Sequence, residues 1–184
     1  MTINDHQVYT VPGLGGSGPG HWQTLWERAH PGWTRVAQSD WNEPDLELWA
    51  GAVAAAVGQG SRAVLIAHSF GCLAAVRAAQ MLGETVAAAL LVAPADPSRF
   101  GLEAQVGRAL ACPAVVAASR NDPWLAWKRA APLARTWEAA LIDLGPCGHV
   151  NTEAGFGPWP AGERLLARLL ARLEASRAAA RRVG

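Results

Sequence analysis

One sequence feature limits the possible folds of this chain more than any other. It is the continuous apolar run from Ala63 to Ala67, with the sequence AVLIA. Uninterrupted apolar runs of this length are typical of strands buried on both faces, as in parallel sheets covered by helices. The segment that follows, Gly71 to Leu82, has the composition of a helix. Because only His68, Ser69 and Phe70 separate the two segments, the chain must turn sharply from a central strand into a helix. An α/β architecture is therefore expected.

The same alternation of apolar runs and helical segments extends along the whole chain. Further strands are expected at Gln7 to Val11, Thr34 to Ala37, Val86 to Val92, Pro113 to Ala118 and Ala139 to Leu144. Helices are expected at Trp22 to Ala29, Leu46 to Val57, Leu102 to Leu110, Leu125 to Thr136 and from Pro160 onward. This order predicts a mostly parallel sheet of about six strands with helices on both faces. Only about 20 residues separate the strand ending at Val92 from the next one, so no large lid domain is expected.

The composition supports one folded domain over residues 1–184. Hydrophobic residues make up 51% of the chain and charged residues 17%, so the chain can bury a sizeable core. This length suits one domain better than two, and no linker or internal repeat divides it. The formal net charge of +1 gives no electrostatic reason to expect nucleic acid or a membrane surface as a partner.

The placement of apolar residues and cysteines indicates a cytoplasmic protein. The first ten residues contain no apolar run of signal length, and no later stretch approaches the roughly 20 apolar residues of a membrane helix. Cys72, Cys112 and Cys147 are too widely spaced for a disulfide framework or a CxxC metal site. We therefore expect free thiols in a reducing compartment, and no bound metal.

Ser69 occupies the turn between the apolar run and the helix, with Ala67 two residues before it and Gly71 two residues after it. This pattern resembles the nucleophile elbow G-x-S-x-G, with alanine in place of the first glycine. A tight strand-to-helix turn lifts a serine hydroxyl clear of the sheet, and the helix N-terminus beneath it favours a developing oxyanion. The alternative is a serine that only caps a buried helix.

A nucleophilic serine needs a base and an acid that orients the base, and α/β-hydrolases supply them in the order Ser, Asp or Glu, His. Asp122 follows the expected strand that ends at Ala118, and His149 follows the next expected strand. Both residues therefore lie just beyond the C-terminal ends of strands, at the edge where open α/β sheets bind ligands. We predict that Ser69, Asp122 and His149 meet at this edge.

Other acids and histidines of the chain are candidates for the same roles. Asp96 is the rival acid because it follows the strand after the elbow, whereas Asp143 lies inside an expected strand and would point poorly. His68 adjoins the serine but is expected to project to the opposite side. The histidines that lack the loop context of His149 are expected to be structural or surface residues; they are His6, His21, His30 and His68.

A glycine-rich loop after the first expected strand contains Gly13, Gly15 and Gly18 in the spacing G-x-G-x-x-G. This spacing is the dinucleotide fingerprint, and Asp40 falls near the position of its ribose-binding acid. The fingerprint requires a helix that runs on from the third glycine, but the proline-glycine pair after Gly18 breaks such a helix. We therefore expect no nucleotide cofactor. In a hydrolase, the backbone N–H groups of Leu14 and Phe70 would instead form the oxyanion hole.

Five segments carry a resemblance to a known family. They are PGLGGSGPGHWQTLW at 12–26, DWNEPDLELW at 40–49, AHSFGC at 67–72, SRNDPW at 119–124 and GHVNTEAGFGPWPAG at 148–162. Together they resemble the compact α/β-hydrolases named after the mammalian retinoblastoma-binding protein, with a bacterial branch of predicted serine esterases. The resemblance covers nearly the whole chain.

The resemblance implies the α/β-hydrolase fold and places the family's triad on Ser69, Asp122 and His149. Trp41 and Trp124 are expected to line the substrate pocket. The chain contains no L-x-C-x-E sequence, so the partner binding behind the mammalian name is not carried over.

The function predicted from these observations is serine acyl transfer to water, on small acyl esters or amides, without a metal or cofactor. Two alternatives belong to other classes. One is a binding protein with a hydrolase fold whose triad is intact but weak or inactive. The other is a nucleotide-dependent oxidoreductase, which the glycine-rich loop alone suggests.

Overall fold

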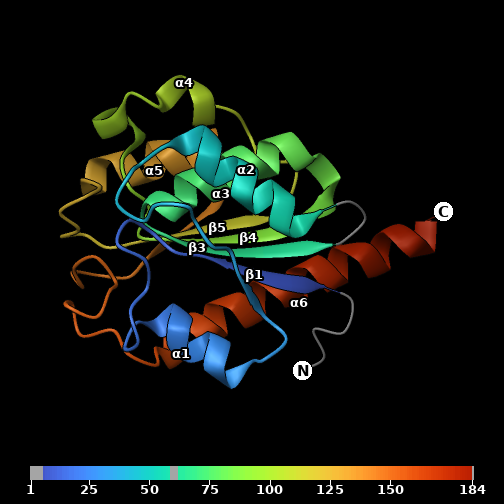
Figure 1. Cartoon of the computed structure of the whole chain (residues 1–184). Coiled ribbons are helices and arrows are strands. Elements are labelled where there is room, and N and C mark those ends of the chain that lie inside the picture. Colours follow the sequence, from blue (N-terminus) through green and yellow to red (C-terminus); the bar gives the residue numbers. More distant parts are fainter. Residues whose placement is uncertain (1–5, 59–61, 184) are drawn as a thin grey trace.

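The computed structural model describes residues 6–58 and 62–183, and its strands form one six-stranded sheet (Figure 1). The strand order is β2-β1-β3-β4-β5-β6, and every neighbouring pair runs parallel. The strands are β1 (Gln7–Val11), β2 (Thr34–Arg35), β3 (Ala63–His68), β4 (Val86–Val92), β5 (Ala114–Ala118) and β6 (Ala140–Asp143). The strand that leads into Ser69 is therefore central, as the apolar run predicted.

Helices cover both faces of the sheet (Figure 1). They are α1 (Trp22–Ala29), α2 (Leu46–Val57), α3 (Phe70–Leu82), α4 (Glu103–Val106), α5 (Trp127–Thr136) and α6 (Pro160–Val183), with short 3₁₀ turns η1 (Gly83–Thr85) and η2 (Pro97–Phe100). Helices α1 and α6 lie on one face, and α2, α3 and α5 lie on the other. The expected α/β class is confirmed.

The sequence of strand β3 does not alternate between polar and apolar residues, because both faces of the strand are buried. All six of its residues are buried. Val64 and Ile66 pack in the core with α1 and α6, whereas Leu65 and Ala67 pack in the core with α2 and α3. Burying an aliphatic side chain of this size contributes about 1.5–3 kcal/mol, so both faces of the strand stabilise the fold.

Two tryptophans of helix α1, Trp22 and Trp26, bind the loop that follows β6. The ring of Trp22 lies 5.2 Å from that of Trp159, and its indole Nε1 donates a 2.9 Å hydrogen bond to the carbonyl of Val150. Trp26 Nε1 donates a 2.7 Å bond to the carbonyl of Pro158. These bonds fix the chain on both sides of residues 151–157, next to the predicted histidine at position 149.

Five expected elements are shorter than the sequence suggested, and three of them, β5, β6 and α5, differ from the expected ranges by only one or two residues. Strand β2 ends at Arg35 instead of Ala37, because it lies at the sheet edge and pairs only with β1. The helix expected over Leu102 to Leu110 is reduced to α4, since the carbonyl of its last residue, Val106, accepts a 2.9 Å hydrogen bond from Trp137 Nε1.

The connection from β4 to β5 contains only η2 and α4, so no large lid covers the sheet edge. Within residues 6–58 and 62–183, no helix has both the length and the apolar character needed to cross a membrane.

Candidate active site

Ser69 stands in a strained turn between β3 and α3. Its φ of 55° and ψ of −127° are unusual for a residue other than glycine, and such conformations cost about 1–3 kcal/mol. Neighbouring strand β4 holds the turn, because the Ser69 N–H donates to the carbonyl of Val92 and the Ser69 carbonyl accepts from Ala95. The hydroxyl makes no helix-capping bond. The interpretation of Ser69 as a simple helix cap is therefore wrong.

The turn requires glycine where backbone from another segment passes closest. A Cβ atom built on Gly71 would lie 2.3 Å from the carbonyl oxygen of Pro12 and 2.4 Å from that of Val11. A Cβ atom on Gly13 would lie 2.6 Å from Ser69 Cβ. The loop after β1 is thus pressed against the serine, and Leu14 is the next residue along that loop.

His149 bridges Ser69 and Asp122. Its Nε2 lies 2.8 Å from Ser69 Oγ, and its Nδ1 lies 2.9 Å from both carboxylate oxygens of Asp122. The Asp122 side chain is only 2% exposed, and its Oδ1 also accepts a 2.8 Å bond from the backbone N–H of Trp124. A carboxylate on Nδ1 fixes the proton there, which leaves Nε2 free to accept the serine proton.

Hydrogen bonds between two loops keep the acid and the base in register. The side-chain oxygen of Asn121 accepts from the backbone N–H of Gly148 at 2.7 Å, and Ser119 Oγ accepts from that of Cys147 at 3.0 Å. The N–H of Arg120 donates to the carbonyl of Gly145 at 2.9 Å. The loops after β5 and β6 therefore behave as one unit that carries both members of the pair.

The alternative acids are engaged elsewhere. Asp96 accepts from Arg129 Nη2 at 3.1 Å; burial alone would raise its pKa, but hydrogen bonds from Arg129 and Ser98 outweigh this effect and lower the pKa. Asp143 pairs with Arg120 at 2.6 Å, and this hydrogen bond lowers its pKa. These ion pairs account for the positions of both carboxylates, so neither is needed as the acid beside His149.

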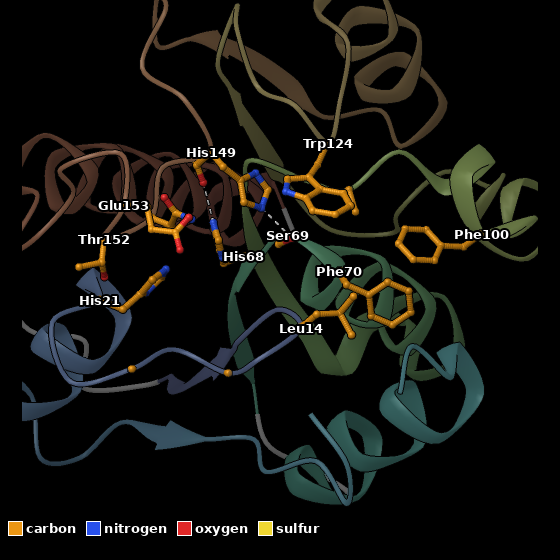
Figure 2. Close-up of a pocket in the computed structure, with 14 residues that line it drawn as sticks. Leu14, His21, His68, Ser69, Phe70, Phe100, Trp124, His149, Thr152 and Glu153 are labelled. Carbon is orange, nitrogen blue, oxygen red and sulfur yellow. Dashed lines mark hydrogen bonds between the residues drawn. The ribbon is translucent and has the colours of Figure 1, made fainter. Parts of the chain in front are cut away.

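A cavity of about 340 Å³ opens over Ser69 and His149 (Figure 2). Leu14, Phe70 and Trp124 are among the residues that line it. The remaining lining residues are Gly16, Gly18, His21, His68, Ala95, Phe100, Asn151, Thr152 and Glu153.

Trp41 does not line this cavity, in contrast to the prediction. Its carbonyl accepts a 2.8 Å hydrogen bond from the N–H of Gly15, and a Cβ atom built on Gly16 would lie 3.5 Å from its ring. The ring also packs edge-on against Trp49 at 5.7 Å. Trp41 therefore packs against the glycine-rich loop, because its side chain lies between that loop and α2.

Two histidines that were expected to be structural or surface residues lie beside His149. His68 donates from Nε2 to the carbonyl of His149 at 2.9 Å, and its ring is 4.8 Å from the His149 ring. Burial lowers its pKa well below 6.5, so the ring is neutral. His21 lies 4.8 Å from His68 on the other side, and burial with nearby Arg35 lowers its pKa to about 4.

No local signal in the sequence marks His21 and His68 as site residues. Their position depends on where the loop after β1 meets the loop after β6, which is a property of the folded chain. His68 was expected to project away from the serine, but instead it lines the same cavity.

Among the described residues, no group of three or more His, Cys, Asp or Glu side chains could hold a metal ion. Cys72, Cys112 and Cys147 are free thiols. Burial raises the pKa of Cys72, and it raises that of Cys112 to about 11, so both favour the thiol form over the reactive thiolate at neutral pH.

Comparisons with known proteins agree with this geometry. A family model described as serine hydrolase matches residues 8–168. The chain is similar to a crystal structure described as a YdeN-like hydrolase of Pectobacterium atrosepticum, at 40% identity and a TM-score of 0.87, over 92% of each chain. It is also similar to the ydeN gene product of B. subtilis, at 23% identity and a TM-score of 0.74, over 90% of this chain and 99% of that one.

More distant structures share the fold. Est1E of Butyrivibrio proteoclasticus, solved with ferulic acid bound, aligns over 90% of each chain at 11% identity and a TM-score of 0.66. No curated protein sequence matches the chain.

Proposed function

The chain belongs to the serine hydrolase family, and we propose that it is a carboxylesterase that cleaves small acyl esters through an acyl-enzyme on Ser69. The observation that carries the proposal is the continuous hydrogen-bonded series from Ser69 Oγ through His149 to the buried carboxylate of Asp122. The nucleophile Ser69 and the orienting acid Asp122 both lie within hydrogen-bond distance of the base, His149.

In the proposed reaction, Ser69 Oγ attacks the ester carbonyl carbon while His149 Nε2 takes the serine proton. Asp122 holds the imidazole in the required tautomer and stabilises the imidazolium. When the tetrahedral intermediate collapses, the carbon–oxygen bond to the alcohol breaks and His149 returns the proton to that alcohol. Water, deprotonated by the same imidazole, then attacks the acyl-enzyme, and the acid leaves with Ser69 regenerated.

We assign the oxyanion hole to the backbone N–H groups of Leu14 and Phe70. Phe70 is the first residue of α3, where N–H groups have no partner within the helix and the helix dipole favours negative charge. Leu14 follows Gly13, whose missing side chain lets the loop approach Ser69. Both residues line the cavity above the serine.

The substrate class follows from the size and the walls of the cavity. A volume of about 340 Å³ without a covering lid suits a short acyl chain or a small aromatic acyl group better than a long lipid chain. Leu14, Phe70, Phe100 and Trp124 supply apolar surface on one side of Ser69.

We propose that the glycine-rich loop forms part of this site, and we do not assign it to nucleotide binding. Helix α1 begins at Trp22 and is capped by His21, so it does not run on from Gly18. Gly13 instead packs against Ser69.

Free thiols favour a reducing compartment, and we place the enzyme in the cytoplasm on that ground. The expected relation to the branch named after the retinoblastoma-binding protein stays a prediction.

Steady-state hydrolysis of p-nitrophenyl acetate, butyrate and octanoate tests the proposal. Wild-type protein should turn over the short esters, and Ser69→Ala should lower kcat by several orders of magnitude, on the order of 10⁶ if the residues act as a triad. Ser39→Ala is the matched control, because Ser39 is exposed and lies outside the cavity. Retention of the full rate by Ser69→Ala would refute the assignment.

A further inference from the structure

The cavity over Ser69 has two chemically different ends. Figure 2 shows Leu14, Phe70, Phe100 and Trp124 on one side of the serine, and His21, Thr152 and Glu153 on the other. The first end is apolar, and the rings of Phe70 and Phe100 pack there at 5.0 Å. The second end presents only polar side chains, contributed by the N-terminus of α1 and by the segment after His149. An acyl chain fits the first end, so the second end remains for the rest of the substrate.

The hydrogen bonding of His21 determines what its ring offers to this polar end. His21 is the N-cap of α1, and its Nδ1 accepts the backbone N–H of Gln23 at 3.2 Å. A nitrogen that accepts a hydrogen bond carries no proton, so in the neutral ring the proton must lie on Nε2. The ring is neutral, since burial and Arg35 lower its pKa to about 4. His21 Nε2 is therefore a fixed hydrogen-bond donor.

That donor has no partner among residues 6–58 and 62–183. His21 is 5% exposed, and its Nε2 is buried without any hydrogen bond to the described part of the chain. The neighbouring His68 cannot accept through Nε2, because that nitrogen already bonds the carbonyl of His149. Buried polar groups are almost always satisfied, so an unpartnered donor in a cavity wall is expected to meet an acceptor on a ligand.

The direction of proton transfer assigns this end to the leaving group. His149 gives its proton to the departing alcohol oxygen, so the alcohol must lie on the His149 side of the reacting carbon. Residues 151–153 follow His149 after one intervening residue, Val150, and form the polar end with His21. The apolar end borders Phe70 and Leu14, the residues assigned to the oxyanion.

We propose that the polar end binds an alcohol leaving group that carries a further hydroxyl, with His21 Nε2–H donating to that hydroxyl oxygen. A hydroxyl also donates, and the carboxylate of Glu153 at the same end supplies an acceptor. The preferred substrates are thus short-chain esters of diols or polyols instead of simple alkyl esters. This inference rests on the proposed function, because it concerns the second half of the same ester.

A matched pair of esters tests the proposal. 2-Hydroxyethyl butyrate and propyl butyrate have the same acyl group and nearly the same shape, and they differ in one hydroxyl in place of a methyl group. Wild-type kcat/KM should favour the hydroxyethyl ester by about tenfold or more, after division by the ratio of the two alkaline hydrolysis rates. A buried donor left unpaired by the alkyl ester is the physical reason for the preference.

His21→Asn separates the donor from the helix cap. The asparagine oxygen can replace Nδ1 as the acceptor for Gln23, whereas no atom of asparagine reaches the position of Nε2. The preference, which is the ratio of the two kcat/KM values measured on the same variant, should fall to about onefold. His30→Asn is the control, because His30 caps the other end of the same helix and lies outside this cavity.

The outcomes are distinct. Equal wild-type rates on the two esters, or a full preference in folded His21→Asn, would overturn the inference and leave the esterase proposal intact. Absence of any turnover of both esters and of p-nitrophenyl butyrate would overturn the proposed function itself. The wild-type comparison requires no variant, so a loss of folding in His21→Asn does not prevent the test.

Discussion

Replacing Gly71 by alanine should disable the site without touching any of the residues that react. The added Cβ would lie 2.3 Å from the carbonyl oxygen of Pro12 and 2.4 Å from that of Val11. Ordinary contact requires about 3.4 Å, so one of the two backbones must retreat by about 1 Å. Both are main-chain segments next to central strands, because Val11 ends β1 and Gly71 lies in the first turn of α3, which follows β3.

This displacement of the backbone moves the proposed oxyanion donors relative to Ser69. A misplacement of about 1 Å costs on the order of 10² in rate, and removal of one oxyanion donor costs about 10²–10³. We therefore predict a 10²- to 10³-fold lower kcat on p-nitrophenyl butyrate, with KM changed only a few-fold. Overpacking of a tight contact should also lower the free energy of unfolding by about 1–3 kcal/mol.

Gly51→Ala is the matched control for this substitution. Gly51 lies inside α2, and a Cβ atom built on it would have no neighbour within 4 Å. Alanine in a helix interior is favoured over glycine by about 0.5–1 kcal/mol, so this variant should be more stable and fully active. Urea unfolding and steady-state kinetics measure both quantities. A folded Gly71→Ala protein with wild-type kcat would refute the argument that the close approach sets the oxyanion geometry.

Asp122→Asn should lower kcat by about 10⁴ in ester assays, because an amide that donates to Nδ1 leaves the proton on Nε2, where it blocks acceptance from Ser69. Trp124→Ala should raise KM several-fold for benzoate esters relative to acetate esters, since its half-exposed ring forms one apolar wall of the cavity. The folded-state pKa of His21, at about 4, lies below its ordinary 6.5, so the unfolded chain binds the additional proton. The contribution of the neutral His21 ring to the free energy of unfolding is therefore complete above pH 6.5 and is lost as the pH falls. The free energy of unfolding should fall by about 3 kcal/mol as the pH drops to 4, and urea titrations should find a smaller loss in His21→Asn.

Each member of the predicted triad carries a local signal in the sequence. Ser69 follows an apolar run and precedes a helix, while Asp122 and His149 each follow a strand-like segment in the order that the chemistry requires. Parallel strands place their C-terminal ends at one edge, so three local patterns become one spatial prediction. The structure brings these three side chains within hydrogen-bond distance.

The residues around the triad could not be predicted in the same way. His68 and His21 reach the cavity only because the loop after β1 and the loop after β6 meet over the central strand. Trp41 was placed in the pocket by resemblance, but the loop that it supports lies between it and the cavity. The early end of α4 depends on Trp137, which is 31 residues away in the sequence. Each of these features is set by tertiary contacts, which local composition does not encode.

Intact-protein mass spectrometry after exposure to a fluorophosphonate tests the central claim most directly, because this reagent bonds only to an activated hydroxyl. Wild-type protein should gain one adduct, which peptide mapping should locate on Ser69. Ser69→Ala should gain none, and His149→Ala should react far more slowly. An adduct on another residue, or equal labelling of wild type and Ser69→Ala, would contradict the claim that His149 activates Ser69.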